Sequence, residues 1–164
     1  MTMISKPIID LLRDVHCLDW DGIHGTSHWA RVRNNGMMIA EDNGANSKVV
    51  ELFAFFHDSM RENDNRDPMH GCRAAELVES LTLDFLGINQ EEKSLLMTAC
   101  RHHTDRLSET DNITVLTCWD SDALDLGRIG VMPLQNVYIL IWLSRKALFN
   151  TAMNKVPRMS ENYK

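Results

Sequence analysis

The sequence has 164 residues, of which 44% are hydrophobic and 24% are charged, and its formal net charge is −6. This length and composition are typical of a single globular domain with its own core, here expected over residues 1–164. The negative charge argues against general nucleic-acid binding, which needs a basic surface. The most apolar run, residues 137–143, is too short to cross a membrane, so no membrane partner is expected.

Helical spacing of apolar residues dominates the first third of the chain. This spacing predicts a first helix over residues 8–15. A loop with two glycines follows over residues 19–26, and Ser27 is the predicted N-cap of a second helix. Residues 47–58 are apolar on nearly every side, which indicates a buried central helix.

The remaining helices are predicted mainly from their capping residues. Asp67 and Pro68 have the residue types of the N-cap and first position of a fourth helix. Asn89 and Glu92 resemble a capping box for a fifth helix, which should run to residue 103. The last two helices are expected over residues 113–126 and 134–153. Because strand-like alternation is weak throughout, the pattern predicts an all-α bundle of about six to seven helices.

The four cysteines are Cys17, Cys72, Cys100 and Cys118. None of them forms a CxxC pair, and the last three lie in helix-like apolar patterns. The first residues lack the apolar stretch of a signal peptide. These features indicate reduced thiols in a cytoplasmic protein.

Several histidines and aspartates fall where a helix should face the core. His28, His103 and Asp122 lie on apolar helix faces, and His57 and Asp58 end the most apolar helix. Taken singly, an inward histidine is usually a hydrogen-bonded core residue, and an aspartate at a helix end is usually a cap. Burying a carboxylate is costly unless it is paired or binds a metal. Their occurrence together favours a divalent metal site, for which imidazole and carboxylate are suitable ligands.

The order of these residues resembles the H…HD…D signature of the HD superfamily of metal-dependent phosphohydrolases, especially its small stand-alone bacterial members. The segments HGTSHWARV, LFAFFHDSMRE and CWDSDALDLGRIG resemble the three motif regions and occur in the expected order. The resemblance covers about residues 24–130. It implies a single HD domain with a divergent C-terminal helix.

The resemblance also implies a ligand set for one divalent ion (Mn, Mg, Fe, Ni, Co or Zn): His28, His57, Asp58 and Asp122. Asp122 is preferred to Asp120 because the family's aspartate precedes an x-Leu pair. Two residues apart on one helix, both carboxylates cannot easily face the same ion. Asp120, Asp125 and His24 are therefore expected to contact the ligands from outside.

Further residues fit a second ion or a phosphate contact. Some superfamily members bind two metals through additional histidines, and His70, His102 and His103 lie in comparable places, with RHHTD resembling the family's HHE stretch. The GYP motif of the HD-GYP phosphodiesterases is absent. Arg61 stands where several HD families carry a phosphate-binding lysine, and its fork can bind phosphate in a bidentate manner.

The activity implied is hydrolysis of a phosphomonoester or phosphodiester, with a nucleotide as the expected small phosphorylated substrate, by metal-activated water. Asp58 would orient the water, Arg61 would stabilise phosphoryl charge, and His102 or His103 would protonate the leaving oxygen. Two alternatives stay open: a nucleotide-binding HD module with weak catalysis, and a di-iron oxygenase of HD fold. The apolar stretch over residues 137–149 is a candidate interface for a homo-oligomer.

Overall fold

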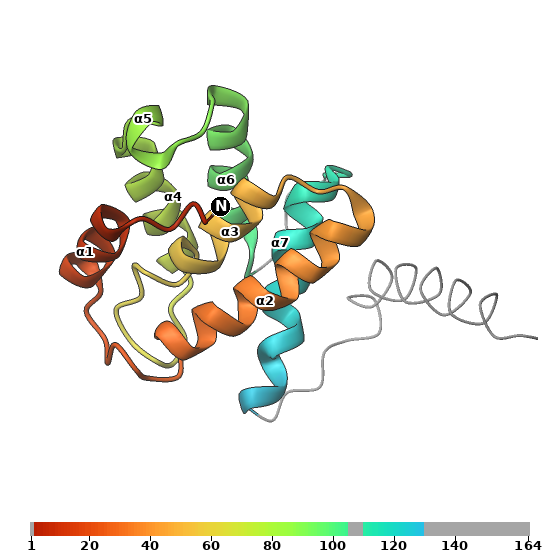
Figure 1. Ribbon diagram of the computed structural model, residues 1–164. Helices are drawn as coiled ribbons and strands as arrows, with labels where there is room; N and C mark the ends of the chain where they lie inside the picture. Colours follow the sequence, from red (N-terminus) through yellow and green to blue (C-terminus); the bar gives the residue numbers. More distant parts are fainter. Residues whose placement is uncertain (1, 105–109, 130–164) are drawn as a thin grey trace, which may run out of the picture.

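The computed structural model describes residues 2–104 and 110–129 of the chain. Within these ranges the elements are α1 (Lys6–Val15), α2 (Thr26–Asn43), α3 (Ser47–Phe56), α4 (His70–Ser80), α5 (Leu83–Leu86), α6 (Gln90–His102), α7 (Ile113–Ala123) and a final 3-10 helix, Leu124–Ile129 (Figure 1). No strand occurs in this part of the chain, so the all-α prediction is confirmed. The helix predicted over residues 134–153 and the interface predicted over 137–149 lie outside the described residues.

Helix α3 forms the centre of the bundle, as the apolar pattern predicted. It packs against α2, α6 and α7, and α4 packs against α6 (Figure 1). Leu52, Phe53 and Phe56 are completely buried. The side chain of Asn46 caps the helix by accepting hydrogen bonds from the main-chain N–H groups of Lys48 and Val49. Helix α3 ends at Phe56, and His57 and Asp58, which follow it directly, are also buried. None of the described helices is long and apolar enough to span a membrane.

The predicted starts of α2 and α4 are each wrong by two residues. Helix α2 begins at Thr26 with Gly25 as its N-cap, and Ser27 is already helical. The loop turns back so closely that a Cβ atom on Gly25 would lie 2.2 Å from the carbonyl oxygen of Trp20, so only glycine fits there. Helix α4 begins at His70 instead of Pro68.

The shift at α4 arises because Asp67 has other partners. Its carboxylate accepts hydrogen bonds from the main-chain N–H of Glu62 at 2.9 Å and from the guanidinium of Arg73. It therefore closes the preceding loop instead of capping the helix.

Capping governs the following segment as well. The capping box of Asn89 and Glu92 at the start of α6 is confirmed. The pattern did not predict α5, which has only four residues. This short helix depends on its ends: Thr82 accepts a hydrogen bond from the N–H of Phe85, and Gly87 adopts the left-handed conformation at φ +67°.

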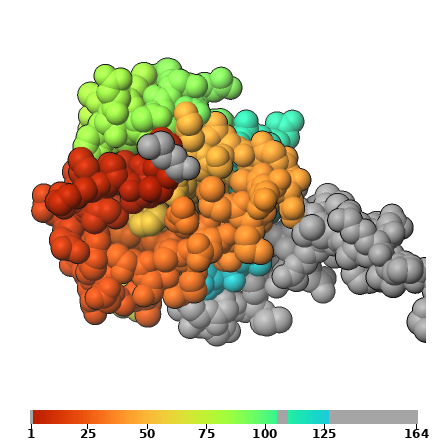
Figure 2. All heavy atoms as spheres, viewed as in Figure 1, coloured from red at the N-terminus to blue at the C-terminus, as the bar shows by residue number. Residues whose placement is uncertain are grey.

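The N-terminal segment is fastened to α3 by one buried carboxylate. Figure 2 shows this segment and α2 covering one face of the molecule. Glu51, on α3, accepts hydrogen bonds of 2.7 Å from the hydroxyl of Thr2, the main-chain N–H of Met3 and the Nε of Arg33. Burial by itself would raise the pKa of Glu51, but these hydrogen bonds and the charge of Arg33 outweigh it and hold the pKa below its usual value.

Replacing Glu51 with glutamine should lower the free energy of unfolding at pH 7 by about 1–3 kcal/mol, because the amide keeps only one acceptor oxygen, places an NH2 group against donors, and removes the charge that pairs with Arg33. Since the folded pKa is depressed, the stabilisation is present above the ordinary value of 4.5 and is lost as pH falls through the folded pKa. Urea unfolding of both proteins at several pH values measures this difference, which should shrink in acid. The exposed Glu41→Gln variant is the control, and equal stability of wild type and Glu51→Gln at pH 7 would contradict the prediction.

Candidate metal centre

The interior of the bundle collects side chains from widely separated parts of the chain. The members of this cluster are His28 on α2, His57 and Asp58 after α3, His70 on α4, His103 after α6, and Asp122 on α7. All are at least nine-tenths buried except Asp122, whose side chain is 20% exposed. Two groups of three within the cluster present ligand atoms within 4.8 Å of one another: His28–His57–Asp58 and Asp58–His70–His103.

Asp58 belongs to both groups because its two oxygens face different histidines. Its Oδ2 lies 3.5 Å from Nε2 of His28 and 3.7 Å from Nε2 of His57. Its Oδ1 lies 3.2 Å from Nε2 of His70 and 3.6 Å from Nε2 of His103. A carboxylate placed in this way can bridge two cations.

Asp122 joins the first group from α7. Its Oδ1 lies 3.4 Å from Nε2 of His28 and 3.6 Å from Nε2 of His57. The first group therefore has two imidazoles and two carboxylates, which is a suitable set for a divalent transition metal.

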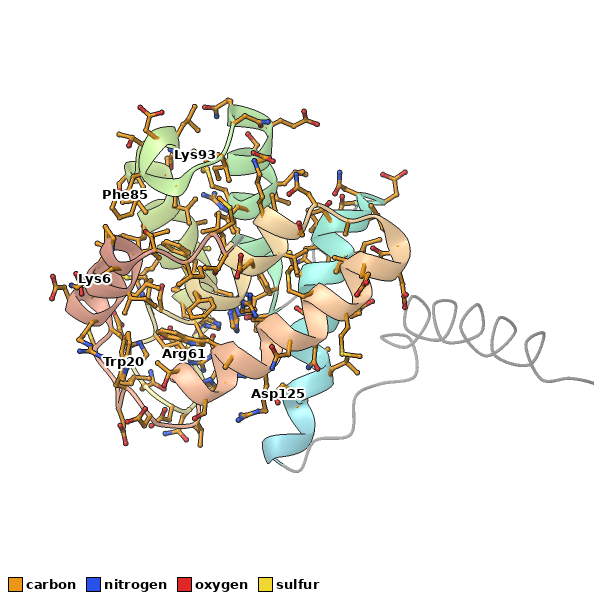
Figure 3. All side chains as sticks on the ribbon, in the orientation of Figure 1. Lys6, Trp20, Arg61, Phe85, Lys93 and Asp125 are labelled. Atoms are coloured by element: carbon orange, nitrogen blue, oxygen red, sulfur yellow. The ribbon has the colours of Figure 1, made fainter. Side chains whose placement is uncertain are left out.

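His28 is held by a carboxylate behind it. Its Nδ1 donates a 2.7 Å hydrogen bond to Oδ2 of Asp125, which is labelled in Figure 3. Nε of Arg31 donates to Oδ1 of the same carboxylate, and Nη2 of Arg31 donates to Oδ2. A carboxylate in this position sets the tautomer of a ligating histidine and makes it more basic. Arg31 lies three residues after His28 on the same helix, and no motif in the sequence indicated its role.

The other histidines of the cluster are oriented by main-chain oxygens near them in the chain. Their Nδ1 atoms donate to acceptors as follows: His57 to Phe53 and Ala54, His70 to Asp67, and His103 to Cys100 at 2.7 Å. Because a carbonyl oxygen only accepts, the proton lies on Nδ1. The Nε2 lone pair of each ring then faces the cluster.

These lone pairs meet at short distance, and this tests whether the residues fit a metal. Nε2 of His28 lies 3.1 Å from Nε2 of His57, and Nε2 of His70 lies 2.8 Å from Nε2 of His103. Two lone pairs at such distances repel each other unless a proton or a cation lies between them. The donor set and its orientation therefore fit divalent cations.

The carboxylates of the cluster are ionised at neutral pH, as ligation requires. When a proton instead of a metal lies between the rings, burial opposes ionisation of Asp58, but the charge of protonated His57 and hydrogen bonds from His103 and His24 outweigh it, and the pKa of Asp58 lies well below its usual value. Burial likewise opposes ionisation of Asp122, yet hydrogen bonding to His57 and its charge lower that pKa too. For His57, burial lowers the pKa, but the neighbouring carboxylates of Asp58 and Asp122 outweigh burial and raise the pKa above its usual value.

The remaining predicted residues lie at different distances from the cluster. His24 contacts Asp58 directly, with its Nδ1 2.8 Å from Oδ2 and its Nε2 3.3 Å from the carbonyl oxygen of Asp64. Asp120 is buried in α7. His102, unlike His103, belongs to neither group of ligand atoms. It lines a hollow between α4 and α6 with Glu79, Ser94, Met97, Thr98 and Arg101.

Arg61 is buried against the second group and does not extend into solvent. Nη1 of Arg61, the residue labelled in Figure 3, lies 3.3 Å from Oδ1 of Asp58 and 3.2 Å from Nε2 of His70. Thr104, which the sequence argument did not identify, also approaches this ring, with its hydroxyl 3.3 Å from Nε2 of His70. It directly follows the His102–His103 pair, so its position in the chain was the available signal.

Gly71 allows α4 and α6 to come close enough for His70 and His103 to meet. A Cβ atom at this position would lie 2.6 Å from the carbonyl oxygen of Cys100 and 3.3 Å from Cε1 of His103. The first of these neighbours is helix backbone, which cannot move aside cheaply.

Gly71→Ala should therefore lower the free energy of unfolding by about 1–3 kcal/mol through overpacking. It should also move His70 away from His103, because it separates α4 from α6, and leave metal binding by the His28–His57–Asp58–Asp122 group unchanged. Urea unfolding and metal titration measure the two effects. Cys72→Ala, which alters the next position without adding atoms, is the control. Unchanged stability in Gly71→Ala would show that the helices can absorb the extra methyl group.

Together, the helical architecture and the buried histidine–aspartate cluster define a protein of the HD-domain fold class. No protein-family model matches the sequence, and no curated protein matches it. Among solved structures, the chain is similar to a predicted HD superfamily hydrolase from an uncultured Thermotogales bacterium. The two share 20% sequence identity over 91% of this chain and 89% of that chain, with a TM-score of 0.61. At this identity the similarity establishes the fold, and it confirms the HD-domain fold that the motifs predicted.

Proposed function

We propose that this protein is a metal-dependent phosphohydrolase that cleaves a phosphomonoester or phosphodiester, with a nucleotide as its substrate. The observation that carries the proposal is the convergence of bare imidazole Nε2 atoms and ionised carboxylates around Asp58 in a buried site. The likeness in fold to a predicted HD superfamily hydrolase supports hydrolysis. The choice of a nucleotide rests on analogy with the superfamily.

His28, His57, Asp58 and Asp122 would hold a divalent ion, and His70 and His103 would lie beside it. A bound divalent cation supplies activation of water at neutral pH and neutralisation of phosphoryl charge. Asp122 is the most exposed member of the cluster, so substrate would approach from its side.

The chain's own side chains would orient the reactants and move protons. Asp58, whose low pKa keeps it ionised, accepts a hydrogen bond from the attacking water and orients it towards phosphorus. Arg61 is the fixed positive charge beside Asp58 and would stabilise charge on the phosphoryl oxygens. Of the two adjacent histidines, His103 is the better candidate to give a proton to the leaving oxygen, because its Nε2 faces the cluster and can carry the proton when the ring is protonated.

One feature favours a second candidate function. A carboxylate shared by two histidine groups is also the arrangement that a di-iron oxygenase of HD fold would use. Such an enzyme would contain two irons and consume oxygen. A nucleotide-binding module with weak catalysis would instead bind nucleotide without forming product.

A substrate and metal panel separates these functions. Purified protein is stripped of metal with a chelator and reloaded with Mn, Mg, Fe, Ni, Co or Zn. It is then assayed with nucleoside monophosphates, cyclic nucleotides and nonspecific phosphodiesters. We expect product formation to require added metal and to stop when a chelator is added. Hydrolysis unaffected by chelation would exclude the proposal, and two irons with oxygen consumption would establish the oxygenase instead.

A further inference from the structure

Arg61 occupies the place that a second cation would need. Its Nη1 lies within 3.3 Å of two of the three ligand atoms of the second group, Oδ1 of Asp58 and Nε2 of His70. Because Nδ1 of His70 already donates to the main-chain oxygen of Asp67, Nε2 is the acceptor for the guanidinium N–H. The lone pair that a metal would use is thus already engaged.

The surrounding loop holds this guanidinium in place. Nη2 of Arg61 donates to the carbonyl oxygen of Asn65 at 2.8 Å, and its Nε donates to that of Asn63 at 3.4 Å. The loop is itself closed by Asp67, which binds Glu62 and Arg73. Arg61 is only 8% exposed, so its position does not depend on a surface rotamer.

The two groups of ligand atoms also differ in charge. The first group has Asp122 in addition to Asp58, whereas the second has only the shared Asp58 among the described residues. A metal ion lies about 2.0–2.2 Å from its nitrogen and oxygen ligands. A divalent ion in the second group would therefore lie against the guanidinium, with no carboxylate of its own to offset the repulsion.

We propose that Arg61 is an internal cation that takes the place of the second metal, so that the protein binds one divalent ion per chain at the His28–His57–Asp58–Asp122 group. This inference rests on the proposed metal centre. Arg61 then limits the protein to one metal ion. Its guanidinium supplies a permanent positive charge at the position where a two-metal site would hold an exchangeable second ion.

Metal stoichiometry tests the proposal without reference to catalysis. Metal-free protein is titrated with Mn²⁺, bound metal is measured by elemental analysis after desalting, and electron paramagnetic resonance detects coupled Mn pairs. We expect one Mn²⁺ per chain in the wild type and two, with a spin-coupled pair signal, in Arg61→Gln. Arg61→Lys keeps the charge and should stay at one. The control Arg66→Gln removes an exposed charge from the same loop and should also stay at one.

The number of Mn²⁺ ions bound by the wild type and by Arg61→Gln supports or contradicts the role of Arg61. Two ions of similar affinity in the wild type would overturn the proposal whether or not any variant folds, and so would a single ion in a folded Arg61→Gln. Circular dichroism and thermal unfolding establish that the variant is folded. A wild type that binds no divalent metal would overturn the proposed function itself. One ion in both proteins, together with metal-dependent hydrolysis, would overturn only the role of Arg61.

Discussion

Asp58→Ala should abolish metal binding and hydrolysis together. Among the residues that the structure describes, Asp58 alone belongs to both groups, with one oxygen directed to each. Loss of an outer partner of a metal ligand already costs about 10–100-fold in metal affinity. Removal of a direct ligand should therefore cost more than about 100-fold in metal affinity, with hydrolysis falling to the level of metal-free protein.

The measurement compares bound metal by elemental analysis with product formation under saturating metal. Asp64→Ala is the matched control, because Asp64 lies in the nearby loop with an exposed side chain and meets His24 only through its main-chain oxygen. Circular dichroism establishes that both variants are folded. Full turnover by a metal-depleted Asp58→Ala protein would reject a role for metal in the reaction.

Asp125→Ala should weaken metal binding while leaving every proposed ligand in place. Asp125 fixes the tautomer of His28 by accepting its Nδ1–H at 2.7 Å, and such outer partners are worth about 10–100-fold in metal affinity. His28 is completely buried, so the deletion also leaves its N–H without this acceptor and should cost about 1–3 kcal/mol of stability.

The two aspartate variants are distinguished by their response to added metal. Excess metal should restore hydrolysis in Asp125→Ala, because its ligands remain, but not in Asp58→Ala. Asp125→Asn keeps an acceptor oxygen for His28 and should lie between wild type and alanine. A metal titration curve of activity for each variant gives the apparent affinity and the plateau separately. A wild-type affinity in Asp125→Ala would show that His28 is oriented without this carboxylate.

Part of the metal centre could be predicted from the sequence, because the position of a residue in an amphipathic or buried helix determines whether its side chain faces the core. His57 and Asp58 directly follow the most apolar helix, α3, so they are buried with its C-terminal end. The separate roles of His102 and His103 were not readable in this way. Adjacent residues at the end of a helix point in different directions, and the packing of α6 decides which one faces Asp58.

Helix starts also divide into those that local sequence determines and those that tertiary contacts determine. The Asn89–Glu92 capping box is local, and it was predicted correctly. Asp67 has the residue type of a cap, but its carboxylate binds Glu62 and Arg73. A residue with several competing partners cannot be assigned from its neighbours in the chain alone.

The sequence by itself determined the all-helical architecture, the buried central helix and the order of the HD motif residues, because periodicity and capping act within a few residues. The tertiary structure alone decided that Asp58 faces two histidine pairs, that Asp125 supports His28 across 97 positions of the chain, and that Arg61 turns inward. These contacts depend on how closely helices approach, as at Gly71, and that distance results from the packing of the whole bundle.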